Sequence, residues 1–165
     1  AQRCVGDNQK QGERLMRAIV QRVKSVRMTV HDPKTGRDSL VESGAGLLIY
    51  VGIGVNDDLR KVLRVAERCR GMRIFEDENG NMNLSVNDIG GSAVIVSNFT
   101  LYADTSHGKR PSFIAAARPE QAIPLYEAFV KKFSEHTPVQ TGVFGADMKV
   151  ESVNDGPINV IVSEE

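Results

Sequence analysis

The chain lacks tryptophan, has only two cysteines, carries no excess of charge of either sign and contains no long apolar run. Cys4 and Cys69 lie far apart and outside any Cys-x-x-Cys or Cys/His cluster, which argues against a zinc site and against a disulfide framework. A reducing compartment fits two isolated cysteines best. Lys+Arg and Asp+Glu both number 21, so any nucleic acid is expected to be held by a local basic patch.

The absence of long apolar runs argues against a membrane span and against a secretory signal peptide. No run approaches the roughly 18 to 20 residues of a membrane span, and the first residues lack the apolar centre of a signal peptide. We therefore expect a cytoplasmic protein with no membrane segment. At 165 residues, 41% hydrophobic, it fits one globular domain. The polar start has no periodicity, so we predict a flexible extension over 1–14 and one domain over 15–165.

The remaining sequence alternates between strand and helix patterns. The predicted strands cover 16–30, as two strands with a bend near Lys24-Ser25, the apolar run 46–54, a hairpin around Asn79-Gly80 and the stretch 92–103. Helical spacing begins at Asp57 and stops at Gly71, and a second helix is predicted over about 120–135. The expected fold class is α/β, a single mixed α/β domain of two packed sheets, barrel-like, with two main helices.

Gly52-x-Gly54 follows a predicted strand and precedes a helix, as in dinucleotide-binding loops. The third glycine position is Asp57, and Asp57-Asp58 would place two negative charges where a pyrophosphate binds. A turn followed by acidic residues at the start of a helix explains the pattern better.

Ser97, His107 and Asp104 supply the residue types of a hydrolytic triad. Asp and His three residues apart in one loop rarely orient each other while reaching a serine on a strand, and the Gly-x-Ser-x-Gly elbow is absent. The loop His107–Arg110 is basic, so it suits either a phosphate contact or a solvated turn.

Two further stretches depart from ordinary strands. The apolar strand becomes polar at "SNFTL", where backbone N–H groups and hydroxyls form either an oxyanion pocket or a plain strand end. In "VNDGPINV", Asp155-Gly156 favours a type I′ hairpin, but Pro157 has no N–H for a ladder and argues against it.

With these residues in view, the chain resembles the D-aminoacyl-tRNA deacylases over nearly its whole length from Met16 onward. The resemblance rests on motifs in the family's order: "MRAIVQRV", "RIFEDENGNMN", "FTLYADTSHGKRPSF" and "TGVFGADM". The two signature motifs, Ser-Gln-Phe-Thr-Leu and Asn-x-Gly-Pro-Val-Thr, appear as "SNFTL" and "NDGPIN". Matches of this length are far more specific than a single short motif.

The resemblance implies an enzyme that hydrolyses the ester joining a D-amino acid to the 3′ end of tRNA. It also implies a homodimer with the active site at the interface, and neither a metal nor an organic cofactor. The first motif would line the pocket for the terminal adenosine and the ester, a role that falls on Ser97, Asn98, Phe99 and Thr100.

The second motif would reach in from the partner chain. Gly156 and Pro157 would present the carbonyls of a cis peptide to the substrate's α-carbon, leaving room for hydrogen but not for a side chain. Glycyl-tRNA should then also be cleaved. Arg22 would help to hold this loop, and Phe144 and Met148 would contribute to the adenosine pocket.

Two residues depart from the family pattern: Asn98 replaces the usual Gln and Asn159 replaces the usual Thr. These replacements bear on the rate of the reaction and on the range of substrates. For the chemistry, we expect backbone N–H groups near Phe99 and Thr100 to stabilise the oxyanion while the tRNA's 2′-hydroxyl helps to position water. The Thr100 hydroxyl as nucleophile is the alternative. A non-catalytic nucleic-acid-binding dimer of the same fold is the alternative function.

Overall fold

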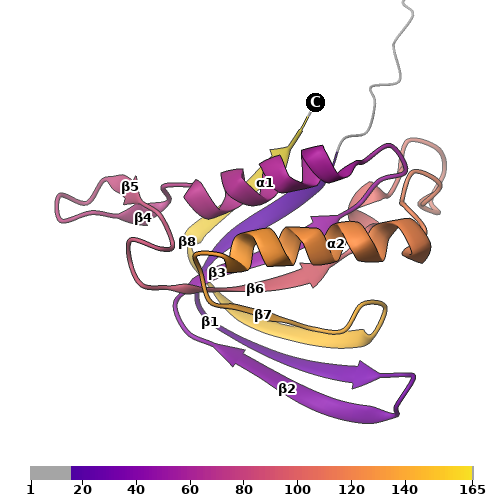
Figure 1. Ribbon diagram of the computed structural model, residues 1–165, viewed down its shortest axis with the longest axis horizontal. Coiled ribbons are helices and arrows are strands. Elements are labelled where there is room, and N and C mark those ends of the chain that lie inside the picture. Colours follow the sequence, from indigo (N-terminus) through magenta and orange to yellow (C-terminus); the bar gives the residue numbers. More distant parts are fainter. Residues whose placement is uncertain (1–15, 165) are drawn as a thin grey trace, which may run out of the picture.

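Two long strands from opposite ends of the chain form the centre of the structure. The computed structural model describes residues 16–164. Its strands are β1 (Arg17–Asp32), β2 (Arg37–Ser43), β3 (Gly46–Gly52), β4 (Phe75–Glu76), β5 (Met82–Leu84), β6 (Ser92–Ser97), β7 (Val139–Thr141) and β8 (Asp147–Ser163). β1 pairs antiparallel with β8, with β3 through its first half and with β2 through its second half (Figure 1). The order in the six-stranded sheet is β2-β1-β3-β6-β7, with β8 on β1, and β4-β5 is a separate hairpin.

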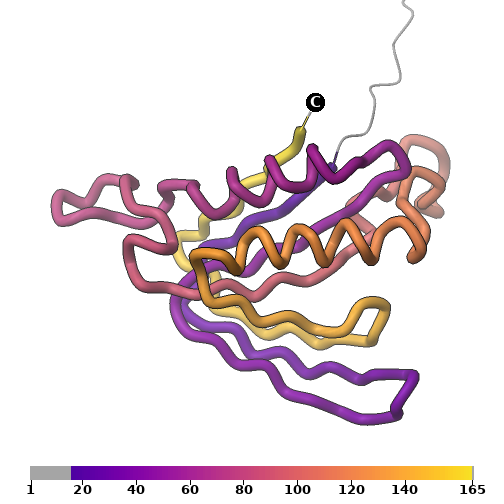
Figure 2. Tube along the Cα trace, viewed as in Figure 1, coloured from indigo at the N-terminus to yellow at the C-terminus, as the bar shows by residue number. Residues whose placement is uncertain are grey.

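The bend in β1 makes the sheet curl into a nearly closed, barrel-like form. The pairing of β1 with β8 shifts register between Gln21 and Val23 and again between Val23 and Ser25, and such bulges bend a strand. The hairpin of β1 and β2 therefore lies on the side of the sheet away from the helices (Figure 2). The predicted bend near Lys24-Ser25 is confirmed, although β1 continues through it as one strand.

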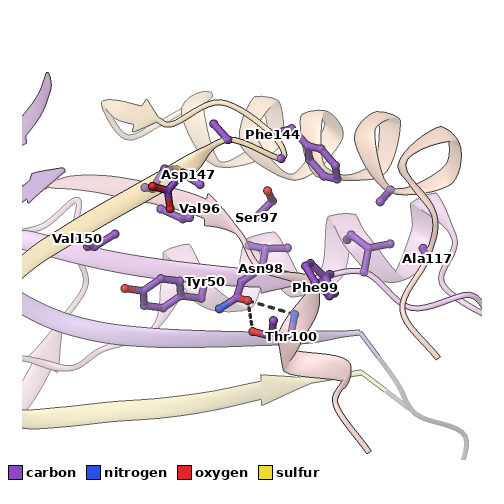
Figure 3. Close-up of a pocket in the computed structure, with 16 residues that line it drawn as sticks. Tyr50, Val96, Ser97, Asn98, Phe99, Thr100, Ala117, Phe144, Asp147 and Val150 are labelled. Atoms are coloured by element: carbon purple, nitrogen blue, oxygen red, sulfur yellow. Dashed lines mark hydrogen bonds between the residues drawn. The ribbon is translucent and has the colours of Figure 1, made fainter. Parts of the chain in front are cut away.

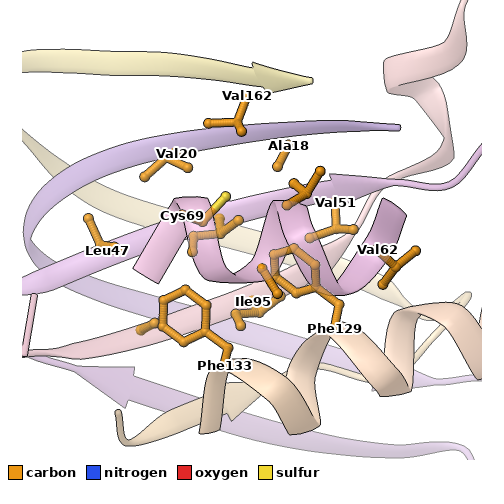
Figure 4. Packing of buried hydrophobic residues seen from close by; sticks show 14 of the residues in the cluster. Ala18, Val20, Leu47, Val51, Val62, Cys69, Ile95, Phe129, Phe133 and Val162 are labelled. Atoms are coloured by element: carbon orange, nitrogen blue, oxygen red, sulfur yellow. The ribbon is translucent and has the colours of Figure 1, made fainter. Parts of the chain in front are cut away.

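Two helices cover one face of the sheet. They are α1 (Leu59–Gly71) and α2 (Pro119–Ser134), and their apolar sides meet the strands in the larger of two cores (Figure 4). Phe129 and Phe133 of α2 are fully buried there. The predicted mixed α/β fold with two main helices is confirmed.

The opposite face of β3 and β6 forms a second core. Leu48, Val94 and Val96 point away from the helices and pack against residues of the curled β1, including Met28. Because β3 is covered on both faces, its sequence is an unbroken apolar run instead of an alternating one.

Two predicted elements differ from the structure. The strand expected over 92–103 ends at Ser97, and Phe99–Tyr102 form a short 3-10 helix, η1. The type I′ hairpin at Asp155-Gly156 is wrong, as Pro157 suggested, because both flanking runs pair with β1 as parts of β8. Asn154 lies opposite Val23 and Asn159 opposite Gln21, so residues 155–158 bulge out of the ladder opposite a single residue.

No helix within residues 16–164 is long and apolar enough to cross a membrane. The extension predicted over 1–14 lies outside the described residues.

Candidate active site

A pocket of about 470 Å³ opens where β6 leaves the sheet. Parallel pairing of β3 with β6 places Tyr50 beside Val96 and Val51 beside Ser97, so both strands contribute to its floor (Figure 3). Most of the lining is apolar and a few polar groups converge on it, which is typical of small-ligand sites. The lining residues are Tyr50, Val51, Ile53, Val96, Ser97, Asn98, Phe99, Thr100, Ala117, Ala122, Phe144, Gly145, Ala146, Asp147, Met148 and Val150. We call this cavity the β6 pocket.

Six of the residues predicted from the sequence lie together in the β6 pocket. Four come from the end of β6 and from η1, and the other two come from the segment before β8 and from its start. They are Ser97, Asn98, Phe99, Thr100, Phe144 and Met148.

Asn98 determines how η1 begins. Its Oδ1 accepts the Thr100 backbone N–H at 3.2 Å and also accepts the Thr100 hydroxyl (Figure 3). Its own N–H donates to the Val51 carbonyl at 2.8 Å, which ties the cap to β3. A short polar side chain that accepts from the second N–H of a helix is an ordinary N-cap.

This cap distinguishes the two N–H groups proposed for the oxyanion. The Thr100 N–H already donates to Asn98, whereas Phe99 is the first residue of η1, where a helical N–H has no acceptor within the helix. The Phe99 ring is exposed and packs edge-to-face on Phe113, with ring centroids 5.1 Å apart. Phe99 therefore offers both a backbone donor and an aromatic face at the pocket.

Two ionisable side chains in the pocket were not predicted from the sequence. Burial raises the pKa of Tyr50. Hydrogen bonds from Lys149, at 2.7 and 2.9 Å, lower the pKa of Asp147, which makes this carboxylate a poor general base. Tyr50 could have been found only from the parallel pairing of β3 with β6, and local sequence patterns do not show which strands pair.

Gly156 and Pro157 do not line the β6 pocket. Their peptide bond is cis, as predicted, and both residues are exposed in the bulge of β8. Gly156 has φ +131°, and a Cβ there would lie 2.7 Å from Ile158 Cγ1, so the position requires glycine. Within one chain, the structure does not bring the two signature motifs together.

Arg22 lies beneath this bulge and is buried. Its Nε donates to the Asp155 carbonyl at 3.2 Å and its Nη1 to the Ile74 carbonyl at 2.8 Å. The Asp155 carboxylate lies 3.4 Å from Nε. The residue preceding Gly156 is therefore held by one guanidinium through both backbone and side chain.

Of the three residues of the hydrolytic triad that the sequence argues against, only Ser97 lines the pocket. Asp104 Oδ1 accepts from the N–H and hydroxyl of Ser106, at 3.0 and 2.6 Å, and His107 is exposed and is not part of the lining. Among residues 16–164, no three His, Cys, Asp or Glu side chains gather in a way that would hold a metal.

Comparison with known proteins gives consistent matches over most of the chain. The family model described as D-Tyr-tRNA(Tyr) deacylase matches residues 19–163. A D-aminoacyl-tRNA deacylase of Chloroflexus aurantiacus is 47% identical over 148 residues, which cover 89% of each chain.

Solved structures share the architecture. A structure titled c-Myc DNA Unwinding Element Binding Protein is 31% identical, with a TM-score of 0.80 over 90% of this chain and 99% of its own. A probable eukaryotic D-amino acid tRNA deacylase has a TM-score of 0.75 over the same shares. At 15% identity this second likeness shows the fold alone.

Proposed function

This chain belongs to the D-Tyr-tRNA(Tyr) deacylase family and is a D-aminoacyl-tRNA deacylase, a hydrolase, and we propose that it cleaves the aminoacyl ester in the β6 pocket. The observation that carries the proposal is that the first signature motif, Ser97 to Thr100, forms one wall of that pocket. The reaction releases a free D-amino acid and intact tRNA, which would keep D-residues out of translation. Because aminoacyl-tRNA is used where translation takes place, we place the activity in the cytoplasm.

The apolar part of the pocket would hold the terminal adenosine. Phe144 and Met148 lie on one side of it and the exposed Phe99 ring on another. An aromatic face and a polarisable thioether suit a purine ring, which binds mainly through stacking and dispersion. The ester, attached to the ribose, would then lie toward Ser97 and the start of η1.

Hydrolysis of this ester needs an oriented water and a donor for the developing oxyanion, because the ester is already activated. The Phe99 N–H is the proposed donor, and the hydrogen bond of the Thr100 N–H to Asn98 supports this choice. The hydroxyl of Thr100 also donates to Asn98, and because an amide oxygen is too weak a base to take the proton, this contact does not activate the hydroxyl as a nucleophile. The 2′-hydroxyl of the tRNA's own ribose would help to position the water.

We further propose that the pocket is completed by a second copy of the chain in a homodimer. Gly156 and Pro157 of the partner subunit would press against the substrate's α-carbon, where a hydrogen fits and an L side chain does not. Three observations support this: the motif is exposed, lies outside its own chain's pocket, and is held from below by Arg22. Glycyl-tRNA would also pass such a filter.

Complementation between damaged subunits tests this arrangement. Ser97→Trp should block the pocket and abolish cleavage, whereas Gly156→Ala should distort the filter and allow cleavage of L-Tyr-tRNA. Co-expressed with different tags and purified through both, a mixed dimer has one open pocket, which faces the intact filter of the blocked subunit. It should therefore recover about half of the wild-type activity on D-Tyr-tRNA and still spare L-Tyr-tRNA, since a two-fold dimer has two equivalent sites. A mixed dimer that cleaves L-Tyr-tRNA would mean that the motif does not act across the interface.

An alternative function is nucleic-acid binding without catalysis by a dimer of the same fold. The similarity to a protein titled as DNA-binding favours it, as does the exposed basic loop around Lys109 and Arg110. Titration of fluorescent duplex DNA against the wild type and a Lys109→Ala/Arg110→Ala variant would test it. Tight, loop-dependent binding together with no cleavage of D-aminoacyl-tRNA would favour this alternative.

A further inference from the structure

The buried residue Asp57 connects the end of β3 to the 3-10 helix of the β6 pocket. Its side chain accepts three hydrogen bonds: Oδ1 from the Met16 N–H at 3.0 Å, and Oδ2 from the Gly54 N–H at 2.6 Å and from the Tyr102 hydroxyl at 3.0 Å. Asp57 is only 7% exposed, so each of these donors replaces a lost water contact. Tyr102 is the last residue of η1.

The two glycines of the Gly-x-Gly pattern make room for η1 at this place. A Cβ on Gly54 would lie 2.5 Å from Tyr102 Cε1, and a Cβ on Gly52 would lie 3.0 Å from Leu101 Cβ and 3.3 Å from the Asn98 carbonyl. Neither glycine has a positive φ, so close approach, and not backbone conformation, explains both. The two glycines that resembled a dinucleotide-binding loop therefore leave the space in which η1 packs, and we call this space the seat of η1.

Arg17 holds the same end of η1 from another side. Its Nη1 donates to the Leu101 carbonyl at 3.1 Å, and its guanidinium lies over the Tyr102 ring, 5.6 Å from the centroid. The far end of η1 is fixed by a buried ring, a buried carboxylate and a cation, whereas its first residue, Phe99, faces the pocket. In a 3-10 helix, residues three apart lie one above the other, so a shift of Tyr102 moves Phe99 with it.

We propose that Asp57 and Tyr102 are positioning residues for the deacylation, which fix the direction of the Phe99 N–H through the three-residue span of η1. The proposal rests on the proposed function of the β6 pocket. Neither residue lines the pocket, so neither is expected to touch the substrate. Their loss should lower the rate of the chemical step and leave substrate affinity largely intact.

Tyr102→Phe is the decisive variant because it removes one hydroxyl and keeps the ring that fills the seat. Tyr126→Phe is its matched control: Tyr126 is a buried tyrosine on α2 whose hydroxyl donates to the Ile95 carbonyl at 2.7 Å, and its ring contact with Phe144 is kept. We expect Tyr102→Phe to lower kcat on D-Tyr-tRNA about tenfold with KM changed less than about twofold, as for a lost orienting hydrogen bond. Both variants should lower Tm by a similar amount, because each loses one buried hydrogen bond, but Tyr126→Phe should keep kcat within about twofold of the wild type.

Amide hydrogen exchange gives a readout that does not depend on activity. In Tyr102→Phe and in Asp57→Asn, exchange of the amides of residues 100–102 should become faster than in the wild type, and in Tyr126→Phe it should not. If the wild type cleaves no D-aminoacyl-tRNA but exchange responds in this way, the proposed function fails and the positioning of η1 stands. Unchanged exchange in Tyr102→Phe, or an equal fall of kcat in Tyr126→Phe, would overturn the positioning role.

Discussion

Replacing Thr100 by alanine tests how the first signature motif acts. The structure gives the Thr100 hydroxyl one hydrogen bond, to Asn98 Oδ1, at an exposed position. Such a bond contributes about 0.5–1.5 kcal/mol, and about 1.4 kcal/mol corresponds to a tenfold change in rate. If the hydroxyl only supports the Asn98 cap, Thr100→Ala should therefore lower kcat on D-Tyr-tRNA by about two- to thirteenfold.

The assay is single-turnover cleavage of D-Tyr-tRNA with enzyme in excess, so that product release does not limit the observed rate. Thr100→Ser is the control, because it keeps the hydroxyl and should stay close to the wild type. A loss of three or more orders of magnitude in Thr100→Ala, with binding intact and Thr100→Ser active, would refute the backbone mechanism and assign the hydroxyl as nucleophile.

Three other predictions concern packing, pH and substrate range. Gly54→Ala places a Cβ 2.5 Å from the buried Tyr102 ring and should destabilise the fold by about 1–3 kcal/mol in urea titrations, whereas Gly71→Ala, with open space around it, should not. A hydrogen bond from Arg64 lowers the pKa of Glu164 below its ordinary value of 4.5. The Glu164 carboxylate should therefore stabilise the fold fully above pH 4.5, and this contribution should disappear as the pH falls through the lowered pKa. A difference in unfolding free energy between wild type and Glu164→Gln that persists at pH 2 would contradict this. Glycyl-tRNA should be cleaved under conditions in which D-Tyr-tRNA is, and its inertness would count against steric rejection of L-substrates.

Elements with a strong local pattern were predictable from the sequence. The apolar periodicity of α1 and its acidic start led to the right helix, where Asp58 accepts from the Lys61 N–H as the N-cap. The unbroken apolar run of β3 indicated a strand buried on both faces, and two cores pack against it. In both cases the residues that decide the structure are neighbours in the chain.

The features that were mispredicted or missed depend on distant residues. The 3-10 helix η1 is set by the Asn98 cap and by a seat built from Gly52, Gly54 and Asp57, so the β-like residues around it were misleading. The Asp155-Gly156 turn signal was overridden because both flanking runs pair with β1. Tyr50 joins the pocket through the parallel pairing of β3 with β6 and Asp147 through the curl of the sheet, and no local pattern reports either of these long-range contacts.

The central claim is that this protein hydrolyses D-aminoacyl-tRNA and rejects the L form, and the most direct measurement compares the two on one tRNA. D-Tyr-tRNA and L-Tyr-tRNA are incubated separately with purified protein at low concentration, and the remaining ester is followed over time against a buffer control. We predict rapid loss of the D-ester, with release of free D-tyrosine, while the L-ester decays at the rate of the buffer control. Equal cleavage of both esters, or cleavage of neither, would contradict the account.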